Sequence, residues 1–168
     1  MNATLAAWNK ADHASAFEAM MACCASKRWA VAMVNLRPID GLLELSEFAD
    51  RLWGTMQEPD WLEAFAAHPR IGERKATTTG QPAAWSQQEQ SGTGSASELV
   101  LAELAEGNQL YERRFGFTYI VCATGKSAEE MLAILKRRLA GSRDTELREA
   151  AEQQRQIMQT RLGKWLIE

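Results

Sequence analysis

The chain has 168 residues, of which 46% are hydrophobic and 24% charged, and its formal net charge at neutral pH is −3. This balance is typical of a globular protein with one sizeable core, and it argues against disorder, nucleic-acid binding and docking on anionic membranes. Because no apolar run reaches the ~18 residues of a spanning helix and the amino terminus lacks a secretory signal, we expect a cytoplasmic protein.

The first part of the chain, residues 3–24, is predicted to be helical with a break around Asp12 and His13. We expect His13 at the opening of the second helix, in a capping or solvated role. The apolar stripe of that helix recurs at helical spacing and consists of Ala16, Phe17, Met20, Met21 and Cys24.

Three further helices are predicted before residue 68. One runs from Ser26 toward the Arg37–Pro38 pair, since proline disfavours helical geometry in the residue before it. The next is expected to open at Asp40–Gly41 and to end at Gly54; its predicted buried face is Leu42, Leu43, Leu45, Phe48, Leu52 and Trp53. The third restarts at Glu58–Pro59 and leads to His68.

Helical periodicity stops at Pro69, and residues 69–84 are rich in Gly, Thr, Pro and basic side chains. Long irregular stretches in compact domains are usually functional or mobile, and the position directly after His68 favours a functional loop. Ser86 and Glu89 then fit the S-x-x-E capping box, so a helix start is one interpretation of this pair. Ser97 is a second possible start, followed by a long helix.

Residues 115–122 form the one β-like segment. A single strand cannot make a sheet, so we expect an extended buried stretch between helices. Gly125-Lys126-Ser127 resembles the end of a phosphate-binding loop, but Ile120 stands where that motif requires a glycine. Ser127 and Glu130 instead fit a capping box.

Two helices are predicted in the last part of the chain. In the first, from Ser127 to Leu139, Arg138 adjoins the apolar stripe. The last, from Asp144 to about Trp165, carries a thin stripe that suggests packing on the bundle surface or on a partner chain: Leu147, Ala150, Ala151, Gln154, Ile157, Met158 and Leu162. Together the elements predict an all-α, single-domain bundle over residues 1–168, with about seven to nine helices and one short extended segment.

The cysteines and histidines give no metal signature. Two of the three cysteines, Cys23 and Cys24, are adjacent, there is no CxxC pair, and His13 and His68 lie far apart in the sequence. We interpret the cysteines as small buried hydrophobic residues and expect no metal site.

Candidate chemistry gathers around His68, because histidine titrates near neutral pH and can accept or deliver a proton. Glu89 could act as a second proton handler or set the tautomer of His68, and a helix cap is an equal interpretation of it. Arg138 could bind a planar anion through its fork of donors or form a surface ion pair. The residues alone therefore predict a cofactor-free acid/base or ligand site near His68.

Several short motifs occur in one order along the chain, from about Leu5 to Leu162. They are Arg28-Trp29, Arg37-Pro38, His68-Pro69-Arg70-Ile71-Gly72, Ser86-x-x-Glu89-Gln90-x-Gly92, Asn108-x-x-Tyr111, Phe115-Gly116-Phe117-x-x-Ile120, Arg138-Leu139 and Glu146-Leu147. In this order they resemble the 2-oxo-4-hydroxy-4-carboxy-5-ureidoimidazoline (OHCU) decarboxylase family of urate catabolism. The resemblance implies an all-helical, usually dimeric carboxy-lyase of purine metabolism that needs no cofactor.

The resemblance also implies the substrate and the site. The substrate is the product of 5-hydroxyisourate hydrolysis, and the product is (S)-allantoin. The implied catalytic residues are His68, Glu89 and Arg138, and the implied substrate-binding residues are Pro69, Ser86, Gln90, Phe117 and Ile120. The family commonly has an asparagine three residues beyond the arginine, where this chain has Gly141.

The expected mechanism follows from the substrate's chemistry. When CO2 leaves, the adjacent ring imine can take up the electron pair, so no electron-sink cofactor is required. His68 is expected to take the hydroxyl proton and Glu89 to orient the substrate or help hold that proton. Arg138 is expected to contact oxygen that keeps negative charge, and Arg70, Arg74 and Lys75 could attract the anionic substrate.

Two other functions remain open from the residues. One is a non-enzymatic helical module that binds a ligand or another protein. The other is a related purine-pathway lyase or hydrolase acting on a similar ureido compound.

Overall fold

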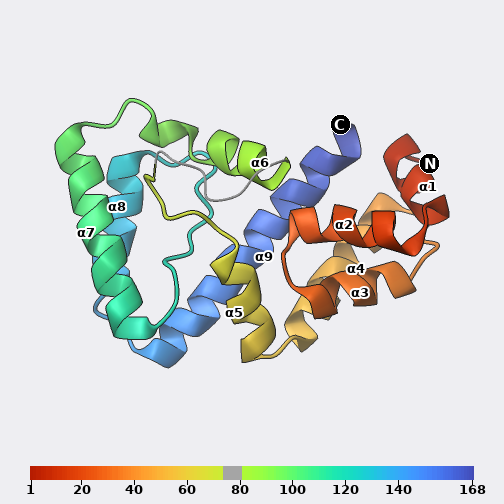
Figure 1. Cartoon of the computed structure of the whole chain (residues 1–168), viewed down its shortest axis with the longest axis horizontal. Helices are drawn as coiled ribbons and strands as arrows, with labels where there is room; N and C mark the ends of the chain where they lie inside the picture. The colour runs from red at the N-terminus through yellow and green to blue at the C-terminus, as the bar shows by residue number, and fades with distance from the viewer. Residues whose placement is uncertain (74–80) are drawn as a thin grey trace. The chain divides into compact units, whose positions relative to one another are not determined.

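The computed structural model describes residues 1–73 and 81–168, and within these ranges it is helical with no strand. This confirms the expected all-α class. The elements, in chain order (Figure 1), are α1 (Ala3–Lys10), α2 (His13–Cys23), α3 (Lys27–Asn35), α4 (Leu42–Thr55), α5 (Glu58–Ala66), α6 (Gln81–Glu89), the 3-10 helix η1 (Ser91–Thr93), α7 (Glu98–Phe115), α8 (Ala128–Arg138) and α9 (Arg143–Ile167).

The chain divides into two compact units, and each is described separately. The first unit comprises Met1–Ala64 and Arg155–Glu168, and the second comprises Phe65–Gln154. One domain over residues 1–168 stays a prediction. None of the helices in the described ranges combines the length and apolar character that crossing a bilayer requires.

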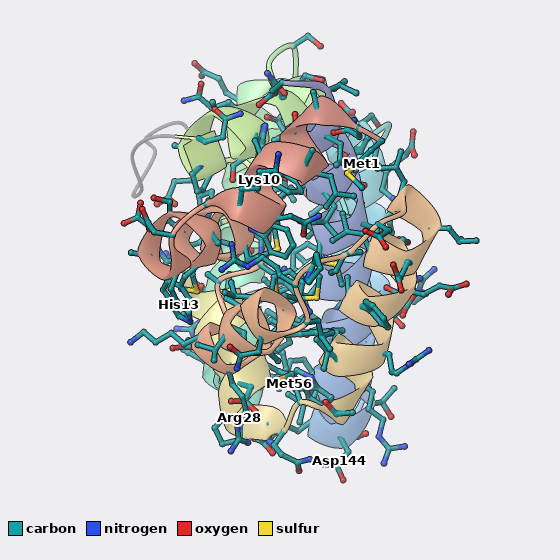
Figure 2. The ribbon with its side chains drawn as sticks, turned by 90° about the vertical axis from the view of Figure 1, so that its right-hand side faces the viewer. Met1, Lys10, His13, Arg28, Met56 and Asp144 are labelled. Atoms are coloured by element: carbon teal, nitrogen blue, oxygen red, sulfur yellow. The ribbon has the colours of Figure 1, made fainter. Side chains whose placement is uncertain are left out.

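The helices of the first unit begin where polar side chains cap them. The Asp12 carboxylate accepts a hydrogen bond from Ser15 N at 2.7 Å, which confirms the expected break between α1 and α2. This backbone bond also lowers the pKa of Asp12. His13 is therefore the exposed first residue of α2 and not its cap, and Figure 2 shows it in this unit with Arg28, which lies in the first turn of α3.

The core of the first unit is built around buried tryptophans. Trp8 Nε1 donates to Ala16 O at 3.0 Å, and Trp29 Nε1 donates to Ala49 O at 3.1 Å, so each indole is satisfied inside the core. Cys23 and Cys24 are buried and unbridged, as predicted. Burial raises the pKa of the Cys23 thiol to about 12.

Two predictions about α4 were wrong. The helix continues through Gly54 to Thr55, with Met56 as its cap. Leu42 and Leu43, expected in the buried face, are 49% and 73% exposed, since the buried stripe follows the four-residue spacing Leu45, Ala49, Trp53. A first-turn leucine off that stripe has no core to enter.

In the second unit, the predicted extended stretch is present but begins at Phe117, because Phe115 is the last residue of α7 and Gly116 caps that helix. Residues 117–123 are non-helical and buried, apart from Thr118, which is half-buried. Ser127 Oγ accepts from Glu130 N at 3.1 Å and donates to Glu130 Oε1 at 3.3 Å, so Ser127 caps the start of α8 as predicted. At Gly107, a Cβ would lie 2.6 Å from Leu135 Cδ2, so the missing side chain lets α7 and α8 approach closely.

The expected capping box at Ser86 and Glu89 was wrong. Helix α6 begins at Gln81, so Ser86 lies inside it and Glu89 is its last residue. Residues 81–84 of the predicted irregular stretch 69–84 are therefore helical, and residues 74–80, with Arg74 and Lys75, lie outside the described residues. All seven residues of the predicted stripe on α9 are buried.

Candidate functional site

A cavity of about 400 Å³ opens in the second unit between the segment after α5, helix α6, η1 and the first turns of α7. Its mixed polar and apolar lining suits a small ring compound with several hydrogen-bonding groups. Three predicted substrate-binding residues, Pro69, Ser86 and Gln90, lie on its wall. The full lining is Pro69, Gly72, Glu73, Ala83, Ser86, Gln87, Gln90, Ser91, Thr93, Gly94 and Leu101.

Ser86 of α6 and Gln90, the residue after its end, share one side of the turn, because positions four apart are neighbours on a helix. Ser86 and Gln90 face the cavity, and Glu89 lies in the same turn. Glu89 is 7% exposed and is not part of the cavity wall. A carboxyl this well buried interacts with its neighbours more strongly than a solvated one.

The segment after α5 is held in place by hydrogen bonds to two side chains. Gly72 N donates to the Gln90 side-chain oxygen at 3.0 Å, and Asn108 Nδ2 donates to Ile71 O at 3.0 Å. Gly72 has φ +84°, in the left-handed region that glycine adopts without strain. Gln90 therefore both lines the cavity and holds the turn that follows His68.

His68 stands just beyond the end of α5 at Ala66, and Pro69 follows it. The imidazole is half-buried, and its Nε2 lies 2.7 Å from the Gln154 side-chain oxygen. Gln154 is fully buried. His68 is therefore followed in the chain by Pro69 of the cavity wall, and its imidazole contacts a glutamine of α9.

Arg138 occupies a second cluster, away from the cavity wall. Its Nε donates to Glu146 Oε1 at 2.7 Å, its Nη2 lies 3.3 Å from Tyr111 Oη, and its Nη1 donates to the carbonyl of Ile120. Tyr111 Oη donates to the same Glu146 oxygen at 2.7 Å. The guanidinium therefore ties α7, α8, α9 and the extended segment together.

Electrostatics in this cluster follow from burial. Burial raises the pKa of Tyr111 and Tyr119 far above the ordinary tyrosine value. Burial alone would lower the pKa of Arg138, but Tyr111 and Glu146 outweigh it and raise that pKa. The cluster consequently holds one fixed ion pair, and its two tyrosines stay neutral.

The remaining two predicted residues lie in the same cluster. The Phe117 ring packs 5.6 Å from that of Phe65 and 5.7 Å from that of Tyr111, while the Ile120 carbonyl is bound by Arg138. The predicted site residues therefore fall into two groups. Pro69, Ser86 and Gln90 line the cavity, with His68 and Glu89 next to Pro69 and Gln90 in the chain, and Arg138, Phe117 and Ile120 form the buried cluster.

Sequence reasoning did not single out Gln154, although a signal was available. It is the one amide in an otherwise apolar predicted stripe, and such a polar residue needs a partner when buried. In the described ranges, no group of three or more His, Cys, Asp or Glu side chains is arranged to hold a metal ion.

Known proteins resemble this chain in both sequence and structure. The family model for OHCU decarboxylase matches residues 9–163. The uric acid degradation bifunctional protein TTL of Arabidopsis thaliana is 35% identical over 144 residues, which cover 84% of this chain and 44% of that protein. This chain thus spans less than half the length of that relative.

Two further matches agree. The 2-oxo-4-hydroxy-4-carboxy-5-ureidoimidazoline decarboxylase of Haloferax volcanii is 27% identical over 128 residues, which cover 76% of this chain and 74% of that protein. A crystal structure of an OHCU decarboxylase, determined in the presence of (S)-allantoin, superposes with a TM-score of 0.77 at 33% identity, and the match covers 88% of this chain and 96% of that one. The chain belongs to the OHCU decarboxylase family.

Proposed function

We propose that this chain decarboxylates OHCU to (S)-allantoin in urate degradation, without a cofactor. Membership of the OHCU decarboxylase family supports the reaction class. The observation that carries the proposal is a cavity whose wall includes Ser86, Gln90 and Pro69, the residue that directly follows His68 in the chain. The related structure determined with (S)-allantoin supports the product.

The first step is proton removal from the hydroxyl on the carbon that bears the carboxylate. His68 takes this proton, because a neutral imidazole is the side chain best matched to proton transfer near pH 7. The bond from that carbon to the carboxylate breaks, CO2 leaves, and the electron pair forms a double bond to the neighbouring ring carbon while the imine nitrogen takes up the displaced pair. The carbon that carried the hydroxyl becomes a carbonyl in the second step, when its neighbour is protonated.

The second step is protonation of the neighbouring ring carbon. The hydroxyl proton and one proton from solvent, which balances the lost carboxylate, go to this carbon and to the former imine nitrogen. Delivery to one face of the carbon gives a single enantiomer. Glu89 is buried in the turn that carries Ser86 and Gln90. It is the second group that takes part in this proton transfer. Ser86 and the donors of the Gln90 amide would fix the orientation of the ring in the cavity.

We propose that Arg138 positions other residues of the protein, whereas the sequence predicted that it binds a substrate oxygen. Direct contact with a substrate oxygen stays a prediction. The contacts of its guanidinium with Glu146, Tyr111 and the Ile120 carbonyl support a positioning role, in which Arg138 holds the extended segment.

The experiment uses substrate generated enzymatically from 5-hydroxyisourate, with product followed by circular dichroism. Spontaneous decay gives both enantiomers, so excess (S)-allantoin reports catalysis. His68→Ala should lower kcat by about 10²- to 10⁴-fold, the usual contribution of a general acid or base. His13→Ala is the matched control, because His13 is exposed and is the other histidine of the chain. Activity of His68→Ala equal to that of His13→Ala would remove His68 from the mechanism.

The alternatives have their own outcomes. A folded protein that leaves the decay of OHCU unchanged would favour a non-enzymatic binding module. Turnover of allantoate or ureidoglycolate would favour a related lyase or hydrolase.

The proposal includes a homodimer and a cytoplasmic location. Light scattering after size exclusion tests whether the protein is a homodimer.

A further inference from the structure

We propose that Gln154 is a positioning residue for His68, whose amide oxygen keeps a hydrogen on Nε2 and so sets which ring nitrogen exchanges a proton. The inference rests on the proposed function for its kinetic consequence. The geometric part stands by itself, because it concerns two side chains of the second unit.

The contact itself is short. His68 Nε2 and Gln154 Oε1 are 2.7 Å apart, at the short end of the range for a hydrogen bond between nitrogen and oxygen. The half-buried imidazole therefore directs its Nε2 edge at a fully buried amide. Water has no access to exchange places with that amide.

The chemistry of the amide fixes the proton. An amide oxygen can only accept a hydrogen bond, so the Nε2 that faces it carries the hydrogen in the neutral ring. The basic lone pair then belongs to Nδ1. A neutral partner sets the tautomer without the strong bias toward the charged imidazolium that a carboxylate would impose.

The burial of Gln154 is not explained by stability. Its Nε2 has no hydrogen-bond partner among the described residues, and an unsatisfied buried donor costs about 1–3 kcal/mol. The neighbouring buried positions on the same stripe, Ala150, Ala151, Ile157 and Met158, are apolar. An apolar side chain of similar length would suit the packing better, so the half-satisfied amide points to a function at His68.

The test compares Gln154→Met with Gln153→Met. Methionine preserves the length of the side chain and removes the acceptor. Gln153 is the adjacent residue, and its amide has other partners: the oxygen accepts from Cys122 N at 2.8 Å, and the nitrogen donates to Glu149 Oε1 at 3.0 Å. Long-range nitrogen–proton NMR spectra distinguish the two tautomers of neutral histidine, and exposed His13 gives the signal of an imidazole in solvent within the same sample.

In the parent, His68 should be almost entirely the Nε2–H tautomer. In Gln154→Met, the Nδ1–H share should rise, while Gln153→Met keeps the parent pattern. An unchanged His68 pattern in Gln154→Met, or an Nδ1–H tautomer in the parent, would overturn the proposal.

Stability and kinetics separate positioning from a structural role. Gln154→Met should unfold at an equal or higher urea concentration than the parent, yet lose about 10- to 100-fold in kcat, as removal of a histidine's supporting partner commonly does. KM should stay unchanged. Lost stability with parent kcat would overturn the positioning role. If the parent itself fails to decarboxylate OHCU, the proposed function falls while the tautomer result is unaffected.

Discussion

Arg138 and Glu146 form a buried ion pair, with Nε and Oε1 2.7 Å apart and each side chain only 4% exposed. The carboxylate also accepts from the Tyr111 hydroxyl, so its charge has two donors. Pairs of this kind are costly to break from one side, because the remaining charge stays buried without compensation.

We therefore expect Arg138→Met to lower the free energy of unfolding by about 3–5 kcal/mol, measured by urea denaturation. Adding Glu146→Gln to Arg138→Met should recover part of this loss, since no uncompensated charge remains. A double variant less stable than Arg138→Met would contradict the ion-pair account.

Arg138→Lys, assayed in its folded state, tests the role of Arg138 in the reaction. A rise in KM would indicate that Arg138 contacts the substrate directly.

Gly92 is expected to tolerate no side chain. A Cβ at this position would collide with the Lys126 carbonyl, which is backbone and has little freedom to move. Gly92→Ala should therefore displace η1, whose Ser91 and Thr93 line the cavity, cost about 1–3 kcal/mol, and raise KM for OHCU. Urea unfolding and steady-state kinetics measure the two effects.

Gly54→Ala is the control for the opposite result. Gly54 lies inside α4, and a Cβ there would meet nothing within 4 Å. The substitution should stabilise the protein by about 0.5–1 kcal/mol, because alanine loses less backbone entropy in a helix than glycine. Destabilisation would mean that Gly54 ends α4 after all.

Gly72→Ala tests the attachment of the His68 segment to Gln90. Gly72 has φ +84°, and a Cβ there would lie 3.3 Å from Leu104 Cδ1. A left-handed backbone of this kind costs an alanine about 1–2 kcal/mol. Shifting Gly72 should weaken its bond to Gln90 and lower kcat/KM for OHCU. Gly116→Ala is matched, because Gly116 has the same φ and an open site at the end of α7. Equal kinetic losses in both variants would contradict the expectation.

Because the Cys23 thiol is buried, we expect the free energy of unfolding to fall at alkaline pH. Its folded pKa is raised from 9.0 to about 12 by burial, so the native state keeps a proton that the unfolded state has lost. The stability from this group is fully present below pH 9.0 and is lost as the pH rises toward 12, by about 1.4 kcal/mol per pH unit. Urea midpoints at several alkaline pH values measure how steeply the free energy of unfolding falls with pH. In Cys23→Ala this fall should be less steep.

The fold could largely be predicted from local pattern. Helix starts at Ala128 and His13 follow from caps within three residues, and the stripe of α9 follows from its period. The pair Ser86 and Glu89 shows where such matches fail. S-x-x-E spacing also occurs inside helices, and only the position of the first unpaired N–H groups decides whether it is a cap.

Only the part of the site that lies on one helix turn could be predicted from the sequence. Residues on one helix turn, such as Ser86 and Gln90, share a face by geometry that spacing encodes. The partner of Arg138 lies eight positions on, beyond a break between helices, and the partner of His68 lies 86 positions away. Such contacts depend on how helices pack, and sequence spacing carries no information about that.

The cluster of Tyr111, Arg138 and Glu146 also limits how this chain can be redesigned. Replacing all three by well-packed apolar residues could match the stability of the ion pair. Such a trio would nevertheless leave the Ile120 carbonyl without the donor that Arg138 supplies, so the extended segment would lose its register. A chain of this kind could fold as tightly as the parent and still work less well, and selection for stability alone would not reveal the difference.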